Sequence, residues 1–240
     1  MNGERKWHCS RFLLRWREET FHNQEIVAKA GFEANIIENH DQPRGASLFI
    51  PEEDYGFYSL SALATIIFCE RGLPFLYQGQ EIGMSNRQWK YDEFNDLETI
   101  NQYQIALKAG MSKEQALEIA RHHSRDNART PMQWSSEENA GFSKGKPWMP
   151  VNENYKVVNV AEEEKEYGSI LNFYKRLIAF YKSEEYNEIL TYGDFRPIYE
   201  KEDHCCSSGS CCDFGGDRDY LCPGTDTGAD LTGKEAGQRL

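Results

Sequence analysis

The chain has 240 residues, 39% hydrophobic and 13% aromatic, a composition that suits one soluble globular core. Its formal net charge of −12 at pH 7 argues against nucleic acid or an anionic membrane as a partner, since their phosphates would repel it. No run approaches the ~18 apolar residues of a membrane helix and the start carries no apolar signal segment, so we expect a cytoplasmic protein.

The first half of the chain alternates between predicted helices and strands. Spaced apolar residues predict a helix over about 6–23, and the apolar run at 34–37 predicts a buried strand. A second helix is expected over 55–70, ending at Arg71-Gly72, and a second buried strand over 74–78. A strand, a helix and a strand within about 45 residues predict a parallel βαβ unit.

The second half begins with a polar and aromatic excursion over residues 85–150, in which we expect one helix. That helix should run from Ser112 to about His123, because Ser112 and Gln115 form a plausible capping box. An amphipathic helix is predicted over 169–182, with its apolar residues on one face.

Polar side chains follow both predicted strands. Residues 38–44 (Glu-Asn-His-Asp-Gln-Pro-Arg) come after the first strand, and Gln78-Gly79-Gln80-Glu81 ends the second. In (β/α) barrels these C-terminal strand ends form the active site, so we expect the two segments at one edge of the sheet. An imidazole, a carboxylate and a guanidinium within five positions suit a hydroxyl-rich ligand and a positive charge developing beside it.

Three motifs carry a resemblance to a known family: Asn-His-Asp-Gln-Pro-Arg at 39–44, Gln-Gly-Gln-Glu-Ile-Gly-Met at 78–84, and Arg-Asp-Asn-Ala-Arg-Thr-Pro-Met-Gln-Trp at 125–134. In this order and spacing they resemble the α-amylase superfamily, most closely its oligo-1,6-glucosidase and α-glucosidase branch. The resemblance implies an α/β fold. It would comprise the C-terminal portion of a (β/α)8 TIM barrel, strands 7 and 8 with their helices, and the start of a C-terminal β domain.

The same resemblance divides the chain into three parts. Residues 1–187 are expected to form the C-terminal part of the catalytic barrel, and residues 188–203 the start of a truncated β domain. Residues 204–240 do not resemble the family, and their low apolar content and many glycines predict disorder. Five cysteines lie in this tail, but their vicinal pairs lack C-x-x-C spacing, so no metal site is predicted.

Roles for the polar cluster follow from the resemblance. Asp41 would be the catalytic carboxylate that stabilises the transition state, and His40 would donate a hydrogen bond to a hydroxyl of the same sugar ring. Arg44 would position substrate or orient neighbouring carboxylates. The residues alone leave other interpretations open: Asp41 could belong to an Asx-type turn or helix cap, and Arg44 could be a surface ion-pair residue.

The implied activity is retaining hydrolysis of terminal α-glucosidic bonds, α-1,6-linked, in short oligosaccharides. Retaining hydrolysis uses two carboxyl groups about 5–5.5 Å apart as nucleophile and acid/base. In the family both precede the segment present here, so we expect the isolated chain to be inactive and poorly packed. The reaction needs no cofactor, the substrate is a small oligosaccharide, and a full-length form would be a monomer. Alternatives are a trehalose-phosphate hydrolase, a dextran glucosidase, a sucrose-isomerising enzyme, a catalytically silent amylase-like subunit, or the product of a misread gene.

Structural roles are expected for several other polar and aromatic residues. Gln78 and Glu81 should bond the backbone near the barrel rim rather than act in catalysis. Arg125, Asp126, Asn127 and Arg129 should form a network that fixes their loop, in preference to direct sugar contact. Core packing is expected for the three aromatic residues Trp134, Phe142 and Trp148.

Overall fold

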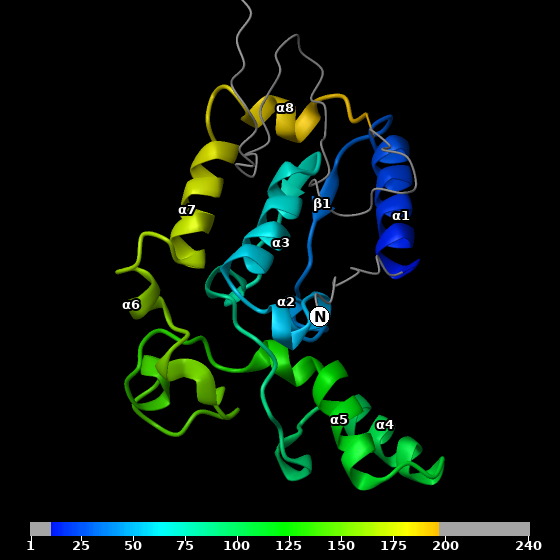
Figure 1. Cartoon of the computed structure of the whole chain (residues 1–240), viewed down its shortest axis with the longest axis vertical. Coiled ribbons are helices and arrows are strands. Elements are labelled where there is room, and N and C mark those ends of the chain that lie inside the picture. The colour runs from blue at the N-terminus through cyan, green and yellow to red at the C-terminus, as the bar shows by residue number, and fades with distance from the viewer. Residues whose placement is uncertain (1–10, 197–240) are drawn as a thin grey trace, which may run out of the picture.

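The computed structural model describes residues 11–196, with side chains from Glu18 onward. Its elements are α1 (Arg11–Val27), β1 (Glu33–Asn35), α2 (Gly45–Phe49), α3 (Phe57–Cys69), β2 (Gly72–Pro74), α4 (Leu97–Lys108), α5 (Lys113–His123), α6 (Val160–Glu163), α7 (Ile170–Tyr181) and α8 (Asn187–Tyr192). In Figure 1, α1 and α3 flank β1, α7 lies beside α3, and the α4–α5 hairpin extends away from the sheet.

The sheet of the described region has two strands, β1 and β2, paired in parallel with Asn35 opposite Pro74. The predicted parallel βαβ unit is therefore present, with α3 between its strands. Both strands are shorter and earlier than predicted, because pairing stops after Phe75 N–H donates to Asn35 O at 2.9 Å and two polar loops begin. The Asn35 side chain also bonds the carbonyl oxygens of Ile67 and Glu70, which ties β1 to the end of α3.

The largest core lies where α3 packs against α7. Its buried members are Ala64, Ile67, Phe68, Ile170, Tyr174, Leu177, Tyr181 and Leu190. The two predicted helices that supply most of them are confirmed, and each falls within one or two residues of its predicted bounds. Ser169 begins α7 as its N-cap, with the hydroxyl accepting from Asn172 N–H.

A second core holds the α4–α5 hairpin together around fully buried Trp89. The capping box of α5 is confirmed, since Ser112 Oγ accepts from Gln115 N–H and Gln115 Oε1 accepts from Ser112 N–H. The prediction of one helix over 85–150 was wrong, because α4 precedes α5. Asp96 caps α4 by accepting from the amides of its first turn, a signal that the sequence already carried.

A helix, α8, occupies the stretch where the sequence led us to expect the opening of a β domain. Leu190 packs into the α3–α7 core, and Tyr181 Oη lies 2.8 Å from Thr191 Oγ1. These contacts hold the segment against α7. The rest of the predicted β-domain stretch and the whole cysteine-containing tail lie outside the described residues. Within residues 11–196 no helix combines the length and apolarity needed to span a bilayer.

Core packing was predicted for three aromatic residues that the structure exposes instead: Trp134 is 51% exposed, Phe142 50% and Trp148 77%. The turn at Asn139–Gly141 explains part of this. Three consecutive residues with positive φ reverse the chain there, and the backbone amides of Trp134 and Ser135 both donate to Ala140 O. Ala140 is therefore the residue that the turn buries, and the larger side chains beside it face solvent.

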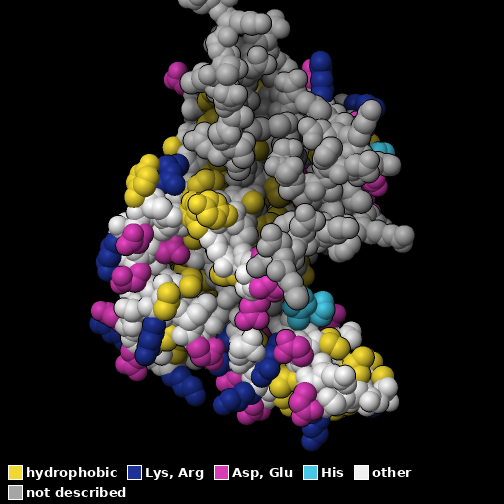
Figure 2. Space-filling model, in the orientation of Figure 1, with side chains coloured by type: hydrophobic (Ala, Val, Ile, Leu, Met, Phe, Trp, Pro, Cys, Tyr) yellow, Lys and Arg dark blue, Asp and Glu magenta, His cyan; other side chains and the backbone are white. Residues whose placement is uncertain are grey.

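Apolar side chains are also exposed beyond the ends of the two strands, at Ile36, Phe75 and Leu76. Figure 2 shows exposed apolar groups in both the upper and the lower half of the face in view, with acidic and basic side chains interspersed most densely over the lower half. A short sheet with unpaired edges and exposed apolar neighbours favours association. We therefore still predict that the isolated chain packs poorly and aggregates. A sharp cooperative melt would contradict this prediction.

Two carboxyl groups at the base of the sheet give the fold a pH dependence. Burial, and then the charge of Glu33, raise the pKa of Glu70 to about 7 from its ordinary 4.5. A raised acid pKa stabilises the folded chain below pH 4.5, and that contribution is lost as the pH rises to 7. We expect this contribution to the free energy of unfolding to fall by about 3 kcal/mol over this range, and Glu70→Gln to remove that part of the pH dependence. Urea titrations at pH 4.5, 6 and 8 measure it in a full-length protein that contains this segment.

The exposed Glu138→Gln is the matched control and should keep the parent profile. An unchanged pH profile in Glu70→Gln would show that Glu70 is not the group responsible.

Candidate active site

Three segments that are distant in sequence meet at the C-terminal ends of the strands, and Arg44 joins them. Its side chain is fully buried. Nη1 donates to Gln78 O at 2.6 Å in the loop after β2, and Nε donates to Asn127 O at 3.2 Å in the turn at 125–129. The loop after β1, the loop after β2 and this turn are thus held by one guanidinium. The two strand-end segments lie at one edge, as the sequence predicted.

The buried charge of Arg44 is matched by Glu38, which is 1% exposed. The two side chains form an ion pair at 3.3 Å, and Glu38 Oε1 also accepts from Gly45 N–H at 2.8 Å. Burial raises the pKa of the Glu38 carboxyl, while Arg44 and the Gly45 amide lower it in part. The alternative of a surface ion-pair residue is wrong for Arg44. Its substrate-binding role stays a prediction, and because the side chain is fully buried, Arg44 would act on a ligand only through the loops it holds.

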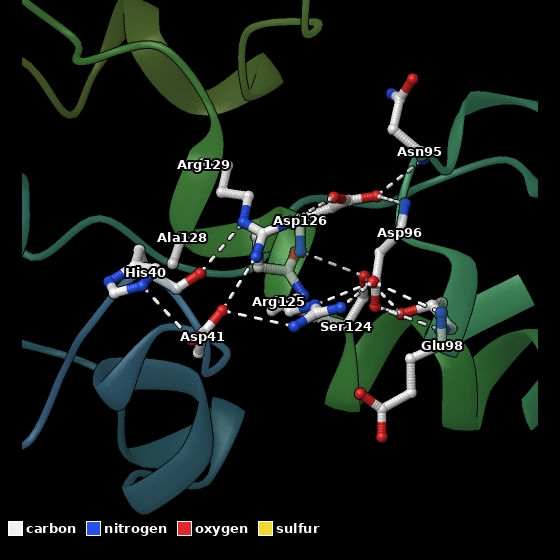
Figure 3. Close-up of polar contacts among 12 residues, drawn as sticks. His40, Asp41, Asn95, Asp96, Glu98, Ser124, Arg125, Asp126, Ala128 and Arg129 are labelled. Atoms are coloured by element: carbon white, nitrogen blue, oxygen red, sulfur yellow. Dashed lines mark hydrogen bonds and ion pairs between the residues drawn. The ribbon is translucent and has the colours of Figure 1, made fainter.

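The carboxylate of Asp41 lies at the exposed rim, between two arginines of the 125–129 turn (Figure 3). Asp41 Oδ1 is 3.0 Å from Arg129 Nη2 and 3.3 Å from Arg125 Nη1, and Oδ2 is 3.3 Å from His40 Nε2. Arg129 Nε also donates to His40 O at 3.0 Å. The Asx-type turn left open by the sequence is made by Asn39, whose Oδ1 accepts from Asp41 N–H, so the Asp41 carboxylate itself is turned toward the arginines.

The 125–129 turn is itself anchored by buried side chains. Asp126 Oδ2 accepts from the amides of Asn95 and Asp96 at 2.8 and 2.9 Å. Asn127 Oδ1 accepts from Arg87 N–H and from Trp89 Nε1–H, which fixes the turn to the α4–α5 region. The predicted loop-fixing network is confirmed for these two residues.

Arg125 of this turn also pairs with Asp96 at the start of α4, a contact that the sequence analysis did not predict. Arg125 bonds Asp96 through Nη2 at 2.7 Å and Asp41 through Nη1, so it links the cap of α4 to the loop after β1. Burial alone would raise the pKa of Asp96, but hydrogen bonds from Arg125 and Thr99 lower it overall. The dense charge of the motif at 125–134 was a signal of pairing, but only the fold reveals Asp41 as the partner.

A cavity of about 280 Å³ opens beside Asp41, between the 125–129 turn and the α4–α5 hairpin. Asp41 and Arg125 form one side, and Thr99, Gln102, Ile119 and His123 are among the hairpin residues that line the other. Its size lies just below the range of about 300–1,000 Å³ usual for drug-sized ligands, which suits a ligand of one or two small rings. No pattern in the sequence indicates that these helices border the Asp41 loop.

The backbone hydrogen bond predicted for Glu81 is confirmed, whereas the one predicted for the Gln78 side chain stays a prediction. Glu81 Oε2 accepts from Gly79 N–H at 2.7 Å, and Gln78 supplies its carbonyl to Arg44. Gly79 has φ 90°, and a Cβ there would lie 2.4 Å from Met84 Sδ and 2.9 Å from Arg44 Nη1. Only glycine fits this position without moving Arg44. Among the described residues, no group of three or more His, Cys, Asp or Glu side chains is arranged to hold a metal ion.

Comparison with known proteins places these features in context. Residues 2–193 match the family described as alpha amylase, catalytic domain. The chain is 39% identical over 200 residues to an oligo-1,6-glucosidase of Bacillus cereus, a match covering 81% of this chain and 35% of that protein. It is 36% identical over 197 residues to a glucan 1,6-alpha-glucosidase of Streptococcus pneumoniae, covering 80% of this chain and 36% of that protein.

Solved structures of similar proteins also superpose on this chain. The trehalose-6-phosphate hydrolase of Bacillus licheniformis superposes with a TM-score of 0.72 at 39% identity, covering 77% of this chain and 33% of the other. The trehalulose synthase MutB of Pseudomonas mesoacidophila superposes with a TM-score of 0.70 at 35% identity, covering 78% and 34%. The chain spans about a third of the length of the curated relatives it matches.

Proposed function

Because this chain belongs to the α-amylase family, we propose that it supplies part of the active site of a glycoside hydrolase that cleaves terminal α-glucosidic bonds in short oligosaccharides. Relatives named oligo-1,6-glucosidase and glucan 1,6-alpha-glucosidase support an α-1,6 linkage as the preferred one. The observation that carries the proposal is the exposed Asp41 carboxylate, held between two arginines beside a cavity.

In this proposal Asp41 stabilises the transition state. As the glycosidic bond breaks, the anomeric carbon gains positive charge, and a fixed carboxylate beside it lowers the barrier more than it stabilises the ground state. Arg125 and Arg129 hold the carboxylate in place, so no reorganisation is needed when the charge develops. His40, 71% exposed and next to Asp41, donates to a hydroxyl of the same ring.

The proposal assigns the remaining roles in retaining hydrolysis to groups outside this chain. Asp41 is one carboxylate, and retaining hydrolysis needs two others as nucleophile and acid/base. We place β1 and β2 as the seventh and eighth strands of the (β/α)8 barrel, within residues 1–187. We also retain 188–203 as the approach to a β domain, with α8 as its helical beginning.

The isolated chain should consequently show no turnover. Incubation of the purified chain with isomaltose, and with a nitrophenyl α-glucoside, should release glucose or nitrophenol at the rate of buffer alone. Turnover above buffer that is lost in Asp41→Asn would show instead that the chain is a complete catalyst. Turnover that survives in Asp41→Asn would point to a contaminating enzyme.

A second candidate function has a specific observation in its favour. One of the solved structures similar to this chain is a trehalose-6-phosphate hydrolase, with the same 39% identity as the Bacillus cereus oligo-1,6-glucosidase. The two activities differ in the charge of the leaving sugar, which is neutral for isomaltose and carries a phosphate for trehalose 6-phosphate. The charges that border Asp41 can therefore distinguish them.

A further inference from the structure

The Asp41 carboxylate faces two positive charges, and by themselves these would oppose the role proposed for it. Its Oδ1 lies 3.0 Å from Arg129 Nη2 and 3.3 Å from Arg125 Nη1. One carboxylate beside two guanidinium groups leaves an excess of positive charge where the anomeric carbon is expected to become cationic. The site therefore needs further negative charge if Asp41 is to favour that transition state.

Asp96 supplies a negative charge directly behind Arg125. Its Oδ1 lies 2.8 Å from Arg125 Nε and 2.7 Å from Arg125 Nη2, closer to this guanidinium than Asp41 Oδ1 is. Figure 3 shows the Arg125 side chain between the two carboxylates. The hydrogen bond and the charge of Asp96, and then the charge of Asp41, raise the pKa of Arg125. Arg125 is thus paired first with Asp96, and Asp41 keeps more of its own charge.

The position of Asp96 is fixed by α4 rather than by the Asp41 loop. Asp96 is the N-cap of that helix, and its Oδ2 accepts from the Thr99 amide at 3.1 Å and from the Thr99 hydroxyl at 2.7 Å. Its side chain is only 4% exposed. Burial would raise the pKa of Asp96, but the bonds from Arg125 and Thr99 lower it overall, so the carboxylate is charged at neutral pH. A charge shielded from water in this way acts over a longer range than a hydrated one.

The second arginine of the turn also has a buried carboxylate behind it. Asp126 Oδ1 lies 3.9 Å from Arg129 Nη1, and the Asp126 side chain is 1% exposed. The group of Asp41, Asp96, Asp126, Arg125 and Arg129 therefore carries one net negative charge. Without the charge of Asp96 the group would be neutral, and Arg125 would pair with Asp41 instead.

We propose that Asp96 is a positioning residue for this reaction, which compensates the charge of Arg125 so that the group around Asp41 presents a net negative charge to the sugar. The inference rests on the proposed function of Asp41. Asp96 acts through Arg125 and not on the reacting atoms themselves. A purely structural role, as the cap of α4 and an anchor of the 125–129 turn, is the alternative that the experiment has to separate from it.

The experiment uses a full-length protein, the chimera in which residues 2–193 replace the matching segment of the Bacillus cereus oligo-1,6-glucosidase. Asp96→Asn keeps a good helix cap, since asparagine and aspartate are equally favoured at the N-cap, but it removes the charge. We expect kcat on isomaltose to fall about tenfold and KM to change by less than about twofold, because the lost charge acts mainly on the cationic transition state. Asp96→Ser, a second neutral cap, should give the same result.

Substituting Arg125 as well tests the balance of charge. Arg125→Gln removes the positive charge that Asp96 compensates. In the Asp96→Asn background it should raise kcat about fivefold above that of Asp96→Asn alone, because the net charge beside Asp41 is restored. If Asp96 served only to anchor the turn, the double variant would lose a second anchor and would be no more active than the single one.

Inhibitors give a readout that does not depend on the rate of bond cleavage. Isofagomine is an iminosugar whose ring nitrogen is protonated at neutral pH, whereas glucose is a neutral ring of similar size. In Asp96→Asn the inhibition constant of isofagomine should rise about tenfold and that of glucose should stay within about twofold, because only the cation responds to the lost charge. A displaced loop would weaken both inhibitors alike.

Asp92→Asn is the matched control, since it makes the same substitution at an exposed residue. It should leave kcat, KM and both inhibition constants within about twofold of the parent values. Charge compensation by Asp96 is wrong if Asp96→Asn keeps the parent kcat, if both inhibitors weaken alike, if Arg125→Gln gives no recovery, or if neither neutral variant folds. These outcomes leave the proposed function standing as long as Asp41→Asn inactivates the same chimera. If Asp41→Asn keeps the parent activity, the proposed function and this inference are both wrong.

Discussion

Asp41→Asn is expected to lower kcat/KM about a thousandfold when residues 2–193 replace the matching segment of the Bacillus cereus oligo-1,6-glucosidase. Asparagine keeps the size of the side chain and one acceptor oxygen, but it removes the negative charge that would face the cationic transition state. KM should change little, because the uncharged ground-state sugar gains less from that charge. Steady-state rates on isomaltose measure the effect.

Loss of stability cannot produce a change of that size. Asp41 is 53% exposed, and its ion pairs with Arg125 and Arg129 are at the surface, where such pairs contribute about 0–1 kcal/mol. A thousandfold change corresponds to about 4 kcal/mol at the transition state. Asp92→Asn, the same substitution at an exposed residue in another turn, is the control and should leave the rate unchanged. An Asp41→Asn chimera that retains parent activity would remove Asp41 from the mechanism.

The sequence predicted the elements that carry strong local signals. The apolar face of α7 and the capping box of α5 each specify a helix without help from the rest of the chain. The parallel pairing of β1 and β2 also followed from local order, because two short apolar segments separated by one helix have few other ways to pack. The residues at which β1 and β2 end were less predictable, because the pairing of the two strands stops where the polar loops that follow them separate.

The arrangement of the site depended on contacts between distant residues, which the sequence could not supply. His40 and Asp41 were found from their motif, but their arginine partners lie 84–89 positions further along the chain. Arg44 was expected near a ligand, and its burial follows from Gln78 and Asn127, which no local pattern links to it. The exposed aromatic residues were mispredicted because the hydrophobicity of a tryptophan does not reveal that a nearby turn buries an alanine instead.

Arg44→Met is expected to lower the free energy of unfolding of the same chimera by about 3–5 kcal/mol at pH 7, measured by urea titration. The substitution removes the partner of the buried Glu38 carboxylate and leaves the carbonyls of Gln78 and Asn127 without their donor. Since burial already raises the pKa of Glu38, losing Arg44 raises it further, and the deficit should shrink as the pH falls and the carboxyl becomes neutral.

A double-mutant cycle with Glu38→Leu separates the charge effect from the lost hydrogen bonds. If the unpaired carboxylate dominates, Glu38→Leu/Arg44→Met should be more stable than Arg44→Met alone, because no ion is then left buried. If the bonds to the two loops dominate, the double variant should be no more stable than the single one. Arg176→Met, at an exposed site on α7, is the control and should cost at most about 1 kcal/mol. An Arg44→Met chain as stable as this control would show that the buried guanidinium does not hold the three segments together.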